Sequence, residues 1–251
     1  MMRLASGLVL TAFVLGQAGS ARADEKAAMA IVDKALKAMG GEEKLAKIKA
    51  ASWKTKGKLH INDADSEFTT HTSYEGLDHY RAQFEGEFNG NTFTAVTVLN
   101  GDKAWRKFGE MIMELDADAI KNEKRNIMLQ VVPSRLVDLK TKDFQIDSAG
   151  EEKVGDKPAV VIKATGPGGK SFKLSFDKET GLPLKLVADV IGFGGEEFTQ
   201  ETLYSDYKAY DGVQHASKVQ TRRDGVSFME LQVTEFKPLD KLPADTFAEP
   251  K

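Results

Sequence analysis

The side chains best suited to acid–base or metal chemistry in this sequence are its four histidines, His60, His71, His79 and His215. His71 and His79 fall on neighbouring predicted strands with acidic residues nearby, so this pair could share a metal ion. Metal sites usually show tighter spacing, such as two histidines one helical turn apart, and that spacing is absent. We therefore expect surface histidines and no metal.

Covalent catalysis has no recognisable machinery in the chain. A hydrolase needs a nucleophile, a base and an orienting acid, yet there is no cysteine and no Gly-x-Ser-x-Gly motif. Residues 166–171, Gly-Pro-Gly-Gly-Lys-Ser, look like a phosphate loop but join two predicted strands, whereas a phosphate loop opens a helix. We interpret them as a hairpin turn. We predict a protein that is not an enzyme and needs no cofactor.

The first residues resemble a secretory signal peptide. Arg3 precedes the apolar stretch Leu4–Val14, and Ala21-Arg-Ala23 is a small-residue cleavage site. We predict cleavage after Ala23, with a non-cleaved anchor as the alternative. Removal of residues 1–23, which contain two arginines and no acidic residue, leaves 228 residues and a net charge of −5. That charge argues against nucleic acid as a partner.

Two helical regions are expected in the remaining chain. Asp24–Met39 has apolar residues at helical spacing and ends at a glycine pair, and a shorter helical piece follows it. Asp116–Val132 has a capping aspartate and is broken by Pro133. Because residues 121–126 are wholly polar, we expect only the ends of this second helix to pack. A short helix, Ser134–Lys140, follows the proline.

The rest of the sequence alternates with the period of two that strands require. Phe172, Leu174 and Phe176 alternate with polar residues, and tight turns separate such runs. We count about ten or eleven strands. Consecutive hairpins predict a mostly antiparallel α+β fold: a strongly curved, open β-barrel (a half-barrel) capped by helices and enclosing an apolar cavity. We expect one domain, residues 24–251, with a helical insertion near 116–140.

Several short sequence segments, and the order in which they occur, resemble those of the outer-membrane lipoprotein carrier-like family of the diderm periplasm. They are Ala35-Leu-Lys-Ala-Met-Gly-Gly-Glu-Glu-Lys-Leu45, Asn100-Gly-Asp-Lys-Ala-Trp105, Val154-Gly-Asp-Lys-Pro-Ala-Val-Val161, Leu174-Ser-Phe-Asp-Lys-Glu-Thr-Gly-Leu-Pro183, Tyr204-Ser-Asp-Tyr207 and the closing Leu242-Pro243. The resemblance covers the chain after the signal peptide. Most of these segments correspond to predicted turns and to the first residues of predicted strands.

The resemblance implies a periplasmic protein that shelters acyl chains in an apolar cavity, with an acyl lipid or lipoprotein as its partner. Carriers of the family use an arginine of an early strand to hold the helical cap, and Arg81 is the nearest candidate; a solvated strand residue is the alternative. We expect a monomer that transiently contacts a membrane-bound partner and possesses no lipid anchor. The same fold also serves as a sensor or regulatory module acting through protein contacts, which is the alternative function.

Aromatic and aliphatic side chains on the predicted inner faces are the candidates for lining the cavity, although a packed core would use the same residue types. They are Trp53, Tyr80, Phe84, Phe88, Trp105, Met111, Met113, Phe172, Leu174, Leu184, Leu186 and Leu231. A fully packed domain without a ligand is a third possibility.

Overall fold

The computed structural model describes residues 17–61, 64–88, 90–192 and 194–251, with the side chains of residues 17–23, 61 and 88 outside the description. Its strands form one antiparallel sheet in the order β6-β5-β4-β3-β2-β1-β13-β12-β11-β10-β9-β8-β7. The strands are β1 Ala50–Ile61, β2 Ala64–Glu75, β3 His79–Phe88, β4 Asn91–Asn100, β5 Lys103–Phe108, β6 Met111–Glu114, β7 Gln145–Val154, β8 Lys157–Thr165, β9 Ser171–Asp177, β10 Pro183–Ile191, β11 Glu197–Tyr210, β12 Val213–Arg223 and β13 Val226–Leu239.

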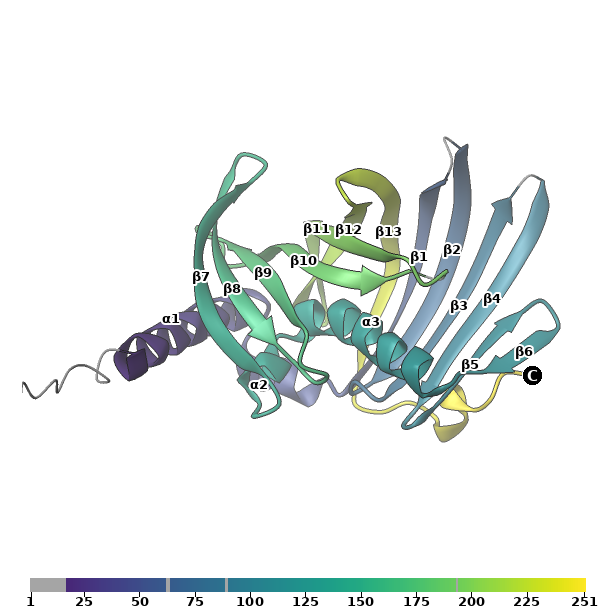
Figure 1. Cartoon of the computed structure of the whole chain (residues 1–251), viewed down its shortest axis with the longest axis horizontal. Coiled ribbons are helices and arrows are strands. Elements are labelled where there is room, and N and C mark those ends of the chain that lie inside the picture. Colours follow the sequence, from purple (N-terminus) through teal and green to yellow (C-terminus); the bar gives the residue numbers. More distant parts are fainter. Residues whose placement is uncertain (1–16, 62–63, 89, 193) are drawn as a thin grey trace, which may run out of the picture.

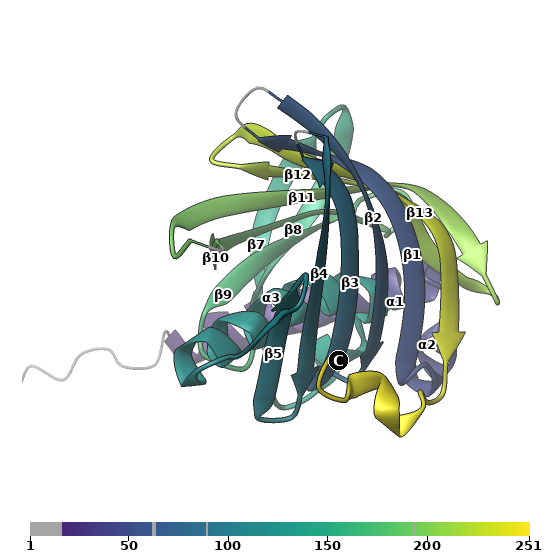
Figure 2. The ribbon, with the colours of Figure 1, turned by 90° about the vertical axis from the view of Figure 1, so that its right-hand side faces the viewer.

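The sheet consists of two meanders, which are joined by the pairing of the first strand with the last. β1 to β6 follow one another across one half, β7 to β13 cross the other, and β1 pairs with β13 from Ala50↔Leu239 to Leu59↔Met229. The sheet is strongly curved and remains open between β6 and β7 (Figures 1 and 2). The predicted fold, an open antiparallel sheet with few helices, is confirmed.

The structure describes thirteen strands where we expected about ten or eleven. Seven of them, β7 to β13, lie between Gln145 and Leu239. Two-residue turns such as Asp211-Gly212 and Asp224-Gly225 link β11 to β13, with all four residues at positive φ. Such turns interrupt the alternation so briefly that neighbouring strands are hard to separate by pattern alone.

The helices are α1 Gln17–Ala38, α2 Glu42–Lys47 and α3 Ala117–Arg135, with 3-10 turns η1 Val137–Lys140 and η2 Ala244–Phe247. α1 packs on β7 and β8, and α3 crosses the concave side of the sheet (Figure 1). Among the described residues, no helix combines the length and the hydropathy needed to cross a bilayer.

The long N-terminal helix extends further towards the N-terminus than the predicted Asp24. It is already helical at Gln17, the first described residue, so it includes the predicted cleavage site. Its apolar stripe is buried against the sheet, and Ala28, Val32 and Ala35 have no exposed surface. These residues all follow Ala23. Cleavage at the predicted position would therefore leave the packed stripe intact.

α3 differs from expectation in two ways. Pro133 does not break it; the helix continues to Arg135 and ends at Leu136, whose φ is 57°. Proline tolerates this position because its φ is helical and only one hydrogen bond, near the helix end, is lost. The polar middle is also packed, since Glu123 and Arg125 are each 8 % exposed. Asp116 caps the helix as predicted, accepting from the amides of Asp118 and Ala119.

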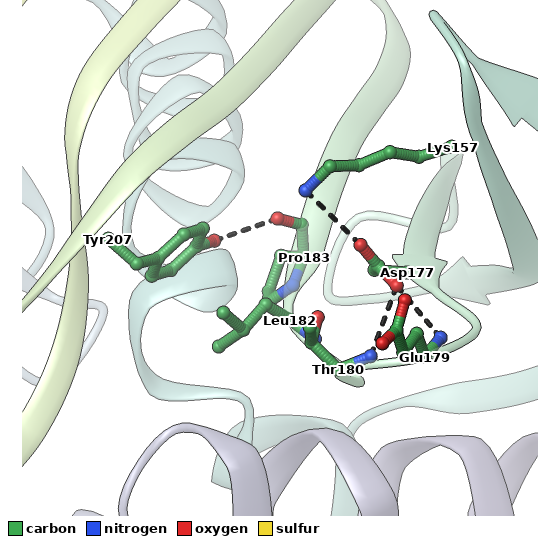
Figure 3. A network of polar contacts seen from close by, with 7 residues as sticks. All are labelled: Lys157, Asp177, Glu179, Thr180, Leu182, Pro183 and Tyr207. Atoms are coloured by element: carbon green, nitrogen blue, oxygen red, sulfur yellow. Dashed lines mark hydrogen bonds and ion pairs between the residues drawn. The ribbon is translucent and has the colours of Figure 1, made fainter.

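The turn between β9 and β10 is held by a buried carboxylate (Figure 3). Asp177, 5 % exposed, accepts from the backbone N–H groups of Glu179 and Thr180 at 2.8 and 3.1 Å and pairs with Lys157 at 3.3 Å. Next to it, the Tyr207 hydroxyl donates to the Pro183 carbonyl at 2.9 Å. Burial disfavours ionisation of Asp177, but the two N–H groups and Lys157 outweigh burial and hold its pKa below the ordinary value.

Replacement of Asp177 by asparagine is expected to lower the free energy of unfolding by about 1–3 kcal/mol at pH 7, because hydrogen bonds to an ionised group are lost in a buried turn. A group with a depressed pKa stabilises the fold above its unfolded-state pKa, near 3.8, and loses that contribution as the pH falls through the folded-state value. Urea unfolding at several pH values should therefore show the difference between wild type and variant shrinking in acid. Asp156→Asn, in an exposed turn, is the control; an equal effect there would contradict the assignment.

Candidate functional site

A pocket of about 390 Å³ lies between α3 and the concave face of the sheet. α3 forms one wall, with Ile127, Gln130 and Pro133 among its lining residues. The opposite wall comes from β1, β3 and β10 to β13. Its side chains include Trp53, Tyr80, Leu186, Val190, Thr202, Tyr204, Tyr207, His215, Val219, Arg223, Met229, Leu231 and Val233.

A second hollow, of about 870 Å³, involves the other face of the sheet. Its lining includes exposed charges of both signs, such as Lys56, Lys58, Glu67 and Glu85. These residues alternate along their strands with Gly57, Phe68 and Gly86, which belong to the concave face. A shallow surface of mixed charge is typical of a solvated sheet, so the pocket beneath α3 is the candidate site.

The polar middle of α3 attaches the helix to both halves of the sheet. On one side, the Glu123 carboxylate accepts from Arg106 of β5 at 2.6 Å. On the other side, Arg125 donates to the carbonyls of Lys170 and Ser171, each at 3.0 Å, and of Asp189 at 3.3 Å. A guanidinium can satisfy several acceptors at once because its donors have a fixed, planar arrangement. These contacts explain why the polar segment is buried.

A tyrosine of the sheet completes the attachment. The Tyr80 hydroxyl donates to Gln130 Oε1 at 2.7 Å. Burial, with the Glu123 carboxylate as a second cause, raises the pKa of Tyr80 well above its ordinary value. The hydroxyl therefore stays neutral and keeps its proton for the bond to α3. Nearer the helix start, Lys124 pairs with Asp102 at 2.9 Å.

The inner end of the pocket is an aromatic wall around His215. Its ring stacks on Phe236 with centroids 4.1 Å apart and lies 6.4 Å from Trp53. Nδ1 is 2.9 Å from the Ala216 carbonyl, so it carries the proton and donates. Burial lowers the pKa of His215 to about 4. His215 is therefore a neutral pocket residue at pH 7, and the expectation of a surface histidine was wrong at this position.

The structure brings four of the predicted lining residues to the pocket: Trp53, Tyr80, Leu186 and Leu231. Phe172, Leu174 and Leu184 are buried elsewhere on the sheet. Phe84 also faces the concave side but lies beyond the pocket, stacked on Phe68 with centroids 5.1 Å apart. Met111 and Met113 lie on β6 and are 56 % and 37 % exposed. The side chain of Phe88 lies outside the described part of the chain.

Trp105 and Arg81 lie on the face of the sheet away from α3. Trp105 pairs with Val98 on β4 and packs against Phe247 of the C-terminal segment, which forms a separate small core. Arg81 is also opposite Val98 in the register and alternates with Tyr80, which bonds to α3. Neither side chain lines the pocket. The arginines that join the middle of α3 to the sheet are Arg106 and Arg125.

The polar part of the pocket was not predicted from the sequence. Gln200, Thr202, Thr221 and Arg223 line it together with Tyr204 and Tyr207. These residues alternate along β11 and β12 and form cross-strand pairs on the concave face. Their period of two along each strand was a usable signal, but polar side chains at inward positions resemble a solvated strand.

A pH dependence of stability is expected from His215. Because its pKa is lowered, the unfolded state binds the proton more readily, so stability should fall as the pH drops from 6.5 towards about 4. The slope contributed by one proton approaches about 1.4 kcal/mol per pH unit. Comparison of wild type with His215→Gln by urea unfolding should isolate the contribution of His215 to the pH dependence of stability. A parallel pH profile in the two proteins would show that His215 is not buried in its neutral form.

The attachment of α3 through Arg125 can be tested by hydrogen exchange. Arg125→Lys retains the charge but cannot reach three carbonyls, so we expect the amides of α3 to exchange faster and the free energy of unfolding to fall by about 1–3 kcal/mol. Lys121→Arg, an exposed position on the same helix, is the control and should change neither quantity. Unchanged exchange in Arg125→Lys would mean that other contacts hold the helix.

No family model matches the chain, and no curated protein matches it. Solved structures do. A LolA superfamily protein from Nitrosomonas europaea shares 13% identity over 88% of this chain and 97% of its own, with a TM-score of 0.57. A domain described as an outer membrane lipoprotein-sorting protein from Vibrio parahaemolyticus shares 13% over 86% and 97%, with a TM-score of 0.54. A DUF1329 family protein from Desulfovibrio piger shares 13% over 88% and 96%, with a TM-score of 0.53. The chain therefore shares the fold of these three structures, in agreement with the resemblance seen in its sequence.

Proposed function

We propose that this protein binds acyl lipids or lipoproteins and shelters an acyl chain in the pocket beneath α3. The observation that carries the proposal is the pocket of about 390 Å³ with aromatic and aliphatic side chains in its inner part. Its volume lies in the range of small-molecule sites. Burial of each methylene group contributes about 0.8 kcal/mol, so a chain can bind here without catalytic groups. We propose that the protein binds its ligand without catalysing a reaction.

The attachment of α3 supports a carrier role. The first half of the helix is joined to the sheet by hydrogen bonds and ion pairs, through Glu123 and Arg125. Its second half is packed into the core through Ile127, Leu129 and Val132. Water can replace the polar contacts when the first half moves away, whereas separation of an apolar interface exposes hydrophobic surface. We propose that outward movement of the first, polar half of α3 admits and releases the chain, and that cargo passes between membranes in this way.

The fold and the sequence support a periplasmic location for this function. One protein with this fold is described as an outer membrane lipoprotein-sorting protein, and the sequence begins with a predicted signal peptide. We propose that the protein acts in the periplasm, makes transient contact with a membrane-bound partner and needs neither metal nor cofactor.

Native mass spectrometry of the protein purified from a periplasmic extract tests the proposal directly. An adduct of lipid mass, recovered by solvent extraction, is the expected result. A protein without adduct that also fails to take up a fluorescent fatty acid would contradict acyl binding.

An additional tryptophan introduced into the pocket should block binding of an acyl chain. Val219 lines the pocket on β12, and Val219→Trp would fill much of the space an acyl chain needs, so we expect uptake of a fluorescent fatty acid to fall at least about tenfold, the equivalent of about 1.4 kcal/mol.

The matched control for this variant is Val187→Trp. Val187 lies on β10 next to the pocket residue Leu186 and therefore faces the opposite side of the sheet. The Val187→Trp variant makes the same change in residue type and should leave uptake of the fluorescent fatty acid unaltered. Equal binding by Val219→Trp and wild type, with both folded by circular dichroism, would place the acyl site elsewhere.

A further inference from the structure

The pocket has a polar end and an apolar end along β11 and β12. Four successive cross-strand pairs face it: Gln200–Arg223, Thr202–Thr221, Tyr204–Val219 and Tyr207–Ala216. At about 3.3 Å per residue these pairs extend over roughly 20 Å. The polar end begins at Arg223, and the other end reaches the aromatic wall around His215. A ligand that lies along this line meets a charge first and hydrocarbon afterwards.

Arg223 is held in place by two aromatic rings and an amide. Its guanidinium carbon lies 3.7 Å from the ring centroid of Phe228 and 5.0 Å from that of Phe198. Nε donates to Gln200 Oε1 at 3.2 Å. A β-bulge places Phe228 there, because Thr221 pairs with Met229 and Arg222 with Ser227, which leaves Phe228 as the extra residue. Bulges commonly redirect a side chain in this way.

The charge of Arg223 has no ion-pair partner within the described part of the chain. Burial lowers its pKa, and Glu196 partly opposes this effect without forming an ion pair with it. Its Nη groups donate to no described protein acceptor. A guanidinium held between aromatic rings presents its remaining donors in a planar fork that matches a carboxylate or phosphate.

The other ionisable groups of the pocket are neutral or already paired. Glu123 is paired with Arg106, His215 has a pKa of about 4, and burial raises the pKa values of Tyr80, Tyr204 and Tyr207. Among the residues described, Arg223 is thus the uncompensated charge of the pocket at pH 7.

We propose that the ligand of this pocket is an amphiphile with an anionic head group, bound with the head at Arg223 and the acyl chain directed towards Trp53. This inference rests on the proposed acyl-binding function and specifies its ligand class. An anion at Arg223 replaces lost hydration of the guanidinium with charge-assisted hydrogen bonds, whereas a neutral head group leaves the charge uncompensated and a cationic one is repelled.

The test compares ligands with the same chain and different heads. Isothermal titration at pH 8, below micelle formation, would measure dodecanoate, dodecan-1-ol, dodecyl phosphate and dodecyltrimethylammonium. We expect dodecanoate and dodecyl phosphate to bind at least about tenfold more tightly than the alcohol, and the ammonium compound to bind most weakly. Acetate and inorganic phosphate, which lack the chain, should show no measurable binding.

Arg223→Gln should weaken dodecanoate binding about tenfold, a change equal to one charge-assisted hydrogen bond, and leave dodecan-1-ol binding unaltered. The neighbouring Arg222 is exposed, on the other face of the sheet, so Arg222→Gln makes the same change in net charge and should alter neither affinity.

Three results would overturn the inference. These are equal binding of acid and alcohol by wild type, an equal loss of both ligands in Arg223→Gln, or equal losses of dodecanoate in the two glutamine variants. Binding of acid and alcohol alike would leave the proposed acyl-binding function standing, whereas binding of neither would contradict that function itself. If Arg223→Gln does not fold, the wild-type order of anionic, neutral and cationic ligands still decides the inference.

Discussion

The pairing of β1 with β13 is the constraint on which the rest of the structure depends. It joins two meanders that would otherwise be separate sheets, and it brings Trp53 of the first beside Phe236 of the last. The concave surface beneath α3 exists only because this ladder makes the halves continuous. Since the paired residues lie far apart in the sequence, their loop-closure entropy must be offset by the whole ladder and by the core it covers.

The second requirement is a helix that spans the two halves. α3 achieves this with side chains that are unusual for a buried surface, because Arg125 reaches carbonyls on the β9–β10 side and Glu123 reaches Arg106 on β5. Each polar group is satisfied, which is the condition under which buried polar contacts are tolerated. The result is a cover with a defined position, whose first half is held by exchangeable polar contacts and whose second half is packed into the core.

The sequence was sufficient for the fold but for only part of the pocket. Alternation separates Tyr80 from Arg81 correctly, because side-chain direction in a strand is a local property. It cannot show that Trp105 would be covered by Phe247, or that Phe228 would be an extra residue beside Arg223, since both depend on register and on distant segments. The polar middle of α3 was misjudged for the same reason: the partners of Glu123 and Arg125 lie on strands that only the folded sheet brings near.

The open sheet leaves two free edges, and each has a feature that discourages strand addition by another chain. β6 has only four residues, Met111–Glu114, and so offers few backbone groups for pairing. β7 is longer but is interrupted by an irregularity between Ser148 and Glu151 and has several charged residues. Short, kinked or charged edges are how natural sheets avoid templating aggregation. A thirteen-stranded sheet can therefore keep its concave face accessible to a guest molecule without recruiting a neighbouring copy along its rim.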